Sequence, residues 1–154
     1  MKAPDFDLPG VDGKRHSPAS ARGENGLVVM FICNHCPYVK RSLDRILRDS
    51  RELAKRGIGS IAVMPNDPAY DAEDSFDNMR RIAKEKAFPF PYVIDETQDV
   101  ARAYDAVCTP DFFGFGADLQ LGYHGRLDEL LQAMTGSPPQ KAMNSIGCSI
   151  KWKR

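Results

Sequence analysis

Apolar residues along the chain follow first a strand pattern and then a helical one. Residues 27–32 form a continuous apolar and β-branched run, and "IGSIAVM" at 58–64 has the same character. Such runs are typical of strands buried on both faces of a sheet. Between them, residues 38–56 place apolar side chains on one helical face and Lys and Arg on the other, and Gly57 stands where a C-cap belongs. The pattern predicts a strand, a helix and a second strand in succession.

The rest of the chain adds shorter elements of both kinds. "DFDL" and the turn at Gly13 predict an N-terminal β-hairpin, and a polar stretch at 66–75 leads into a further helix near Ser75. The remaining expected elements are a strand at 90–95, a helix at 97–104, two strands within 111–125 around a Gly-Ala-Asp turn, and a helix at 127–134. A parallel βαβ unit followed by an antiparallel hairpin and a last helix predicts an α/β sandwich of few strands.

The length fits one domain. A chain of 154 residues can bury a core large enough to fold without disulfides. The only linker-like composition is "TGSPPQ" at 135–140. We therefore expect a domain at residues 1–134 and a C-terminal tail at 135–154 that packs on or near it.

Charge and hydropathy narrow the classes of partner. Lys plus Arg and Asp plus Glu number 21 each, and neither half of the chain concentrates one sign, so neither nucleic acid nor a membrane surface is an expected partner. The longest apolar run, "GLVVMFIC", is far shorter than a membrane span, and the N-terminus carries no signal-like apolar stretch. These features predict a soluble, cytoplasmic protein with reduced cysteines.

The segment "FICNHCPYVK" at 31–40 holds Cys33 and Cys36 at the junction of the first buried strand and the long helix. A CxxC pair at such a junction is used by redox centres and by metal sites. Pro37 suits the first turn of a helix, so Cys36 falls at or next to the N-cap, where free backbone N–H groups favour the thiolate. Cys33 ends a buried strand and has no helix terminus of its own. This predicts Cys36 as the attacking thiolate and Cys33 as the resolving thiol, with no metal or organic cofactor.

Several segments together resemble one known superfamily. The strand-CxxC-helix junction, "APDFDLPGVDGK", and "YDAVCTPDFFGF" followed by "DLQLGYHGRLD" are similar to the thioredoxin-like superfamily, and most similar to its redoxin branch of alkyl hydroperoxide reductase and thiol-specific antioxidant proteins. The resemblance implies a thioredoxin-like fold, with a central mixed sheet flanked by helices and an N-terminal β-hairpin. It also implies that Pro110 is cis and that the backbone around Thr109 pairs with the extended chain of a substrate protein.

The sequence departs from the thioredoxin pattern at the cysteines. Laid over Trp-Cys-x-x-Cys, the segment puts Cys36 on the first cysteine, so the CxxC is displaced by three residues and its attacking sulfur is the C-terminal one. Met30 takes the position of the acid that thioredoxins often carry in the preceding strand. His35 is the nearest candidate for proton transfer, either as a cation beside Cys36 or, with no such role, as an exposed loop residue.

The sequence also departs from the peroxiredoxin pattern Pro-x-x-x-Thr-x-x-Cys. With Cys36 as the peroxide-reactive sulfur, the Thr position holds Cys33 and the Pro position holds Val29. This weakens a peroxidase function without excluding it.

Taken together, these observations favour a thiol-disulfide oxidoreductase acting on protein or small-molecule disulfides and reduced by a thioredoxin-type or low-molecular-weight thiol system. The alternative is a peroxiredoxin-like thiol peroxidase, in which the Cys36 sulfenic acid condenses with Cys33, Cys108 or Cys148. Cys108 precedes Pro110 by two residues, so it either faces the CxxC or is a buried inert thiol. Cys148 lies in "SIGCSIKWKR", which is either a packing strand or a solvated end.

A less favoured alternative is a zinc-binding or non-catalytic module. Zinc sites usually have four ligands, and the chain offers no second close pair of ligands beside the CxxC. The possible ligands are Cys33, His35 and Cys36 with one of Cys108, His124 or Cys148.

Overall fold

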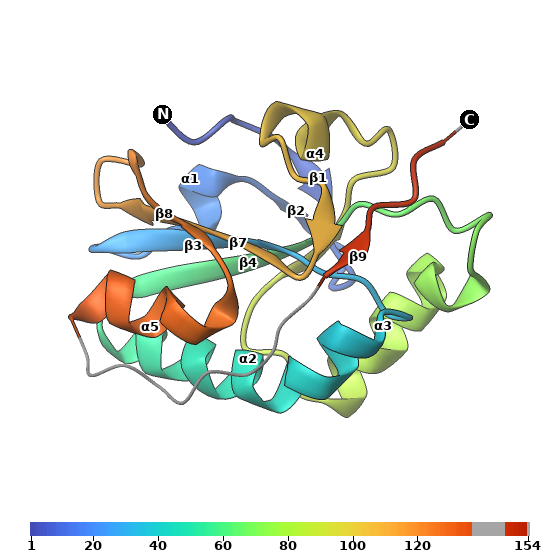
Figure 1. Cartoon of the computed structure of the whole chain (residues 1–154), viewed down its shortest axis with the longest axis horizontal. Helices are drawn as coiled ribbons and strands as arrows, with labels where there is room; N and C mark the ends of the chain where they lie inside the picture. The colour runs from blue at the N-terminus through green and yellow to red at the C-terminus, as the bar shows by residue number, and fades with distance from the viewer. Residues whose placement is uncertain (137–146, 154) are drawn as a thin grey trace.

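The centre of the fold is a mixed β-sheet with helices on both faces (Figure 1). The computed structural model describes residues 1–136 and 147–153. The strands of this sheet lie in the order β5–β4–β3–β7–β8. Its central strands are β3 (Gly26–Phe31) and β4 (Ile58–Met64). They lie side by side, and just after β3 the N–H of Ile32 donates to the carbonyl of Val63 in β4. The other strands of this sheet are β5 (Tyr92–Ile94), β7 (Asp111–Gly116) and β8 (Leu121–Gly125).

The pairing combines both strand directions. β4 and β5 are parallel, with Val63 opposite Val93, whereas β3 and β7 are antiparallel, with Val29 opposite Phe113. Among the described residues, two short pairs lie outside this sheet. They are the antiparallel pair β1 (Leu8–Pro9) and β2 (Arg15–His16), and the antiparallel pair β6 (Cys108–Thr109) and β9 (Cys148–Ser149).

The helices divide between the two faces of the sheet. In Figure 1, α2 (Pro37–Lys55), α3 (Phe76–Glu85) and α5 (Leu127–Thr135) lie below it, and α1 (Pro18–Ala21) and α4 (Asp99–Ala103) lie above it. Within the described part of the chain, none of the helices combines the length and apolar character needed to cross a bilayer.

Successive side chains of β3 point to opposite faces of the sheet, and this explains why its residues are apolar throughout. Val28 and Met30 belong to the core under α2, whereas Leu27, Val29 and Phe31 belong to the core on the opposite face. Because successive side chains of a strand point to opposite faces, a strand covered on both sides must be apolar at every position.

The predicted α/β fold and its long elements are confirmed. The N-terminal hairpin, the buried strands, the amphipathic helix and the β7–β8 hairpin all lie where the pattern puts them, and Gly57 follows α2 with φ 77. Among the described residues, three short elements were missed, namely α1, the 3-10 helix Ala72–Asp74 and β6, and β9 is one of the two alternatives that the sequence left open for its segment. All of these elements are too short to show periodicity, and each depends on local caps or on a distant partner.

The close approach of α1 to β4 gives a prediction on stability. A Cβ added at Gly59 would lie 2.0 Å from the carbonyl oxygen of Ala21, at the end of α1. Gly59→Ala should therefore lower the free energy of unfolding by about 1–3 kcal/mol in urea denaturation, because the backbone has to move apart.

Gly122→Ala is the matched control, because the nearest atom to its added Cβ is the Gly114 carbonyl oxygen at 3.9 Å. It should change stability by no more than about 0.5 kcal/mol. A Gly59→Ala protein as stable as this control would contradict the contact between α1 and β4.

Candidate active site

The cysteine pair lies where β3 passes into α2. Cys36 is the N-cap residue of α2, with φ −63 and ψ 123, and Pro37 is the first helical residue. Cys33 and Cys36 are 2% and 0% exposed, and all four cysteines of the chain are free thiols. The helix start at Pro37, inferred from the sequence, is thereby confirmed.

The sulfur of Cys36 is surrounded by hydrogen-bond donors. The hydrogen bond from the Cys33 thiol is the largest cause of a lowered pKa at Cys36. The Cys148 thiol and the backbone N–H groups of Val39 and Tyr38 also lower this pKa, while burial raises it. Together they lower the pKa of Cys36 from 9.0 to about 4. The Sγ atoms of Cys36 and Cys148 are 2.9 Å apart. The arrangement favours a thiolate at Cys36 at neutral pH.

The pKa of Cys33 is shifted in the opposite direction. Its hydrogen bond to Cys36 raises the pKa of the Cys33 thiol far above the ordinary value, burial and the negative charge of Asp74 add to the rise, and a contact with Thr109 opposes it. The Sγ of Cys33 lies 3.4 Å from Oγ1 of Thr109. The pKa values of the two thiols of the CxxC are thus shifted in opposite directions, and the largest cause is their mutual hydrogen bond, with the helix N–H groups expected from the sequence as a smaller cause at Cys36.

The loop opposite the cysteines contains the expected cis-proline. The Thr109–Pro110 peptide bond is cis. The carbonyl oxygen of Thr109 lies 3.5 Å from Sγ of Cys36 and can accept a hydrogen bond from it when Cys36 is protonated. β6, which holds Cys108 and Thr109, pairs with β9 so that Thr109 is opposite Cys148.

The two remaining cysteines have different positions. The Sγ of Cys108 lies 4.0 Å from the carbonyl oxygen of Pro110, and burial raises the pKa of this thiol. Cys148 is the residue whose sulfur contacts Cys36. Burial, followed by the hydrogen bond with Cys36, raises the pKa of Cys148 to about 11. The sequence left both a packing strand and a solvated end open for this segment, and the structure shows a strand.

His35 forms a hydrogen bond with the buried carboxylate of Asp74. Its Nδ1 lies 2.5 Å from Oδ2 of Asp74, which is 0% exposed. The same carboxylate accepts hydrogen bonds from the backbone N–H groups of Asn34 and His35 and from Nδ2 of Asn66. Since a carboxylate only accepts, His35 donates from Nδ1 and leaves Nε2 for another partner. Asp74 was not anticipated, because its sequence context is a polar loop.

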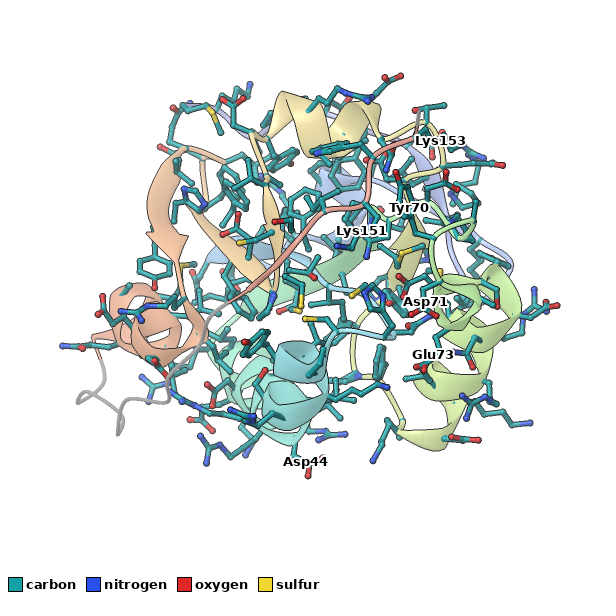
Figure 2. The ribbon with its side chains drawn as sticks, turned by 45° about the vertical axis from the view of Figure 1, so that its right-hand side comes forward. Asp44, Tyr70, Asp71, Glu73, Lys151 and Lys153 are labelled. Atoms are coloured by element: carbon teal, nitrogen blue, oxygen red, sulfur yellow. The ribbon has the colours of Figure 1, made fainter. Side chains whose placement is uncertain are left out.

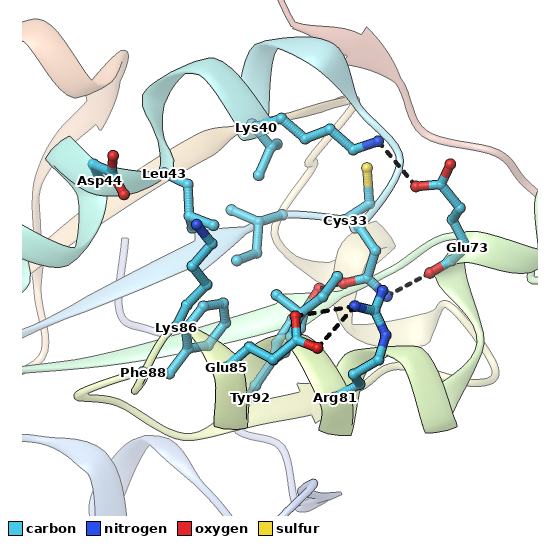
Figure 3. A pocket seen from close by; sticks show the side chains of 14 residues that line it. Cys33, Lys40, Leu43, Asp44, Glu73, Arg81, Glu85, Lys86, Phe88 and Tyr92 are labelled. Carbon is cyan, nitrogen blue, oxygen red and sulfur yellow. Dashed lines mark hydrogen bonds and ion pairs between the residues drawn. The ribbon is translucent and has the colours of Figure 1, made fainter.

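A pocket of about 350 Å³ opens between α2 and α3, and Cys33 lies at one end of it. Figure 3 shows the ion pairs of Lys40 with Glu73 and of Arg81 with Glu85 among the side chains that line it. Cys33 is among the residues that line this pocket, whereas Cys36 and the described tail residues 147–153 are not.

Three potential metal ligands also meet here. A sulfur of Cys33, a ring nitrogen of His35 and a carboxylate oxygen of Asp74 lie within 4.8 Å of one another. The Asp74 oxygens already accept four hydrogen bonds, which matches the capacity of a carboxylate. His124 is held elsewhere, by Asp111 at 2.9 Å and by stacking on Phe113. These residues fit a structural hydrogen-bond network better than a four-ligand zinc site.

The fold and this thiol-bearing junction define a thioredoxin-like oxidoreductase. The chain belongs to the AhpC/TSA family, whose sequence profile matches residues 1–124. No match was found among the curated proteins.

Solved structures are similar over nearly the whole chain. An uncharacterized conserved protein from Geobacillus kaustophilus is 39% identical, with a TM-score of 0.85 over 99% of this chain and 91% of that one. A hypothetical protein from Sinorhizobium meliloti is 29% identical, with a TM-score of 0.86 over 99% of this chain and 93% of that one. A thiol-disulfide oxidoreductase from Bacteroides fragilis, 18% identical, shares the fold, with a TM-score of 0.70 over 88% of this chain and 96% of that one.

The lowered pKa of Cys36 makes stability depend on pH. Between about 4 and 9.0 the unfolded chain holds a proton on Cys36 that the folded chain has released. The free energy of unfolding should therefore rise with pH across this window, by at most about 1.4 kcal/mol per pH unit from this group.

Cys36→Ser removes this contribution, so the stability advantage of the reduced wild type over the variant should grow from about pH 5 to about pH 8 in urea denaturation. The difference between the two proteins also cancels the titration of groups they share. A difference that does not change with pH would contradict the thiolate at Cys36.

Proposed function

We propose that this protein is a thiol-disulfide oxidoreductase with Cys36 as its attacking thiolate. The Cys36 sulfur attacks one sulfur of a substrate disulfide, forming a mixed disulfide and releasing the other substrate sulfur as a thiolate. A second protein thiol then loses its proton and attacks the Cys36 sulfur, releasing the rest of the substrate as a thiolate and leaving an intramolecular disulfide. The dithiol form is restored by a thioredoxin-type or low-molecular-weight thiol reductant.

The observation that carries this proposal is the environment of the Cys36 sulfur. At the N-cap of α2 it receives hydrogen bonds from Cys33, Cys148 and the first helical N–H groups. A nucleophile in disulfide exchange needs a substantial thiolate fraction at ambient pH, and a pKa of about 4 supplies it.

The supporting residues are proposed in the roles that the sequence suggested. Cys33, in contact with Cys36, is the resolving thiol of the CxxC. Pro37 starts α2 behind the nucleophile, Thr109 and Pro110 shape the opposite wall, and Cys108 lies beside them in β6. His35, with Nδ1 held by Asp74, is the group proposed to accept or return protons through Nε2.

The substrates are proposed to be protein or small-molecule disulfides, and the proposed location is the cytoplasm. Neither nucleic acid nor a membrane is a proposed partner, since positive and negative side chains balance at 21 each.

A thiol peroxidase is the second candidate, favoured by the contact between Cys36 and Cys148. The Cys36 thiolate would take one oxygen from a hydroperoxide to give a sulfenic acid and an alcohol or water, and a neighbouring thiol would condense with it, releasing water. The 2.9 Å separation of the two sulfurs suits that condensation. A peroxidase would lose its reactive thiol rapidly with one equivalent of peroxide, whereas an oxidoreductase would react faster with a disulfide.

A zinc-binding module would behave differently from both. Stoichiometric zinc in protein purified without added metal, together with a Cys36 unreactive toward iodoacetamide at about pH 6, would favour that alternative.

Replacing Cys36 tests the proposal directly. Cys36→Ser should reduce the rate of disulfide reduction, measured with oxidised glutathione as oxidant and dithiothreitol as reductant, to that of the protein-free reaction. The double variant Cys33→Ser, Cys148→Ser should stop at a mixed disulfide on Cys36, because both thiols in contact with its sulfur are gone.

Urea denaturation of each variant separates loss of chemistry from loss of fold. A folded Cys36→Ser protein that still reduces the disulfide at the wild-type rate would refute the assignment of Cys36 as the nucleophile.

A further inference from the structure

The C-terminal segment 147–153 crosses the end of the sheet that carries the active site. β9 pairs with β6, and beyond it the N–H of Ile150 donates to the carbonyl of Val107. The Ile150 side chain is buried in the core on the α4 face of the sheet. Figure 2 shows Lys151 and Lys153 along this segment, and Figure 1 shows β9 beside β6.

Two buried amide side chains hold this segment by its backbone. Oδ1 of Asn66 accepts from the N–H of Lys151 at 2.9 Å. Nε2 of Gln98 donates to the carbonyl of Lys151 at 2.7 Å, and its Oε1 accepts from the N–H of Lys153 at 2.7 Å. Asn66 is 3% exposed and Gln98 is 0% exposed.

Gln98 also adopts a left-handed backbone conformation, with φ 66, that is unfavourable for a residue with a side chain. Buried amides without partners are costly, and these amides find partners on the tail. The docked position of the tail is therefore built into the fold.

The docked tail brings the sulfur of Cys148 to the sulfur of Cys36. Because Thr109 and Cys148 are opposite each other, the β6–β9 pairing places Sγ of Cys148 2.9 Å from Sγ of Cys36. A disulfide bond is about 2.05 Å long, so bond formation needs an approach of only about 0.9 Å. Gly147 permits the close pairing, since a Cβ there would lie 2.9 Å from Sγ of Cys108 and 3.0 Å from the carbonyl of Thr109.

We propose that Cys148 is a second resolving thiol, which closes a Cys36–Cys148 disulfide when the group bound to Cys36 is small enough for β9 to return to β6. This inference rests on the proposed function and specifies how that site handles low-molecular-weight disulfides. Cys36 is 0% exposed and its sulfur is in contact with Cys148, so in this proposal the Gly147–Ser149 end of the tail moves away before an oxidant reaches the sulfur.

The proposed reaction with glutathione disulfide consists of two successive thiol-disulfide exchanges. The Cys36 thiolate attacks glutathione disulfide, giving a Cys36–glutathione mixed disulfide and one glutathione thiolate. β9 then returns, Cys148 gives up its proton, and its sulfur attacks the Cys36 sulfur, releasing the second glutathione. The oxidant gains two electrons and the protein loses two.

The surroundings of the two candidate resolving thiols favour Cys148 at this step. Once Cys36 is in a mixed disulfide, it no longer accepts hydrogen bonds as a thiolate, so that cause of a raised pKa disappears from both neighbours. Cys33 remains 2% exposed and close to the negative charge of Asp74. Cys148 is more exposed and has the cation Lys151 nearby, which lowers the pKa of its thiol.

The two resolving thiols thus serve different adducts. An extended polypeptide joined to Cys36 and paired along β6 would occupy the edge that β9 uses. Cys148 would then be displaced, and Cys33 would be the thiol left in contact with Cys36.

Disulfide mapping with a small oxidant tests this proposal. The reduced full chain is mixed with less than one equivalent of oxidised glutathione, quenched in acid at increasing times, alkylated, digested with trypsin and analysed by mass spectrometry. Trypsin leaves Cys33 and Cys36 together in fragment 23–40 and Cys148 in fragment 142–151. The first intramolecular disulfide should join these two fragments through Cys36. A Cys33–Cys36 disulfide appearing first would overturn the proposal.

Two variants test the role of Cys148 by the decay rate of the glutathione adduct, without relying on which disulfide appears first. In Cys148→Ser the Cys36–glutathione adduct should decay at least about tenfold more slowly than in the wild type. Gly147→Ala keeps every thiol but holds β9 away from β6, so it should also slow the decay, whereas Gly122→Ala should not.

Decay in Cys148→Ser at the wild-type rate, with glutathione on Cys36, would overturn the role of Cys148 and leave the proposed function standing. A Cys36 that forms neither a glutathione adduct nor an intramolecular disulfide would overturn both.

Discussion

The sulfur of Cys36 is buried, and a buried anion is stable only where donors replace the water that it has lost. Those donors come from three parts of the chain: the end of β3 supplies Cys33, the first turn of α2 supplies backbone N–H groups, and the tail supplies Cys148. β3 leads directly into α2, and β9 pairs with β6 at the same end of the sheet, so the fold brings all three together. The contacts that favour the thiolate at Cys36 disfavour it at both neighbouring cysteines.

Under the proposed function, this coupling orders the chemistry. While Cys36 is a thiolate, Cys33 and Cys148 stay protonated and donate to it, so of these three sulfurs the proposed nucleophile is Cys36. When Cys36 forms a covalent bond in the proposed reaction, its neighbours lose their acceptor and become available to resolve it. Asn66 connects this centre to the tail, because it donates to Asp74 beside His35 and accepts from Lys151. The same buried residue therefore supports both the active-site loop and the docked tail.

The sequence was sufficient for those parts of the site that depend on local structure. Pro37 after a cysteine, at the end of a buried apolar run, predicted the N-cap position of Cys36, because helix starts follow local rules. The resemblance to redoxins predicted the cis bond before Pro110.

The sequence left Cys148 as one of three thiols that could react with Cys36 and did not decide its position, since β9 has only two residues and its partner lies about 40 positions away in the chain. Asp74 was missed for a similar reason. Its burial depends on donors at Asn34, His35 and Asn66, which the fold assembles around it.

The most direct test of this account is a pH titration of the ultraviolet absorbance of the thiolate, taken as the difference between the reduced wild type and Cys36→Ser. The account predicts one thiolate appearing with a midpoint near 4 and fully formed at neutral pH. A midpoint near 9.0, the ordinary value for a cysteine, would mean that the contacts around Cys36 do not activate it, and the central claim would fail.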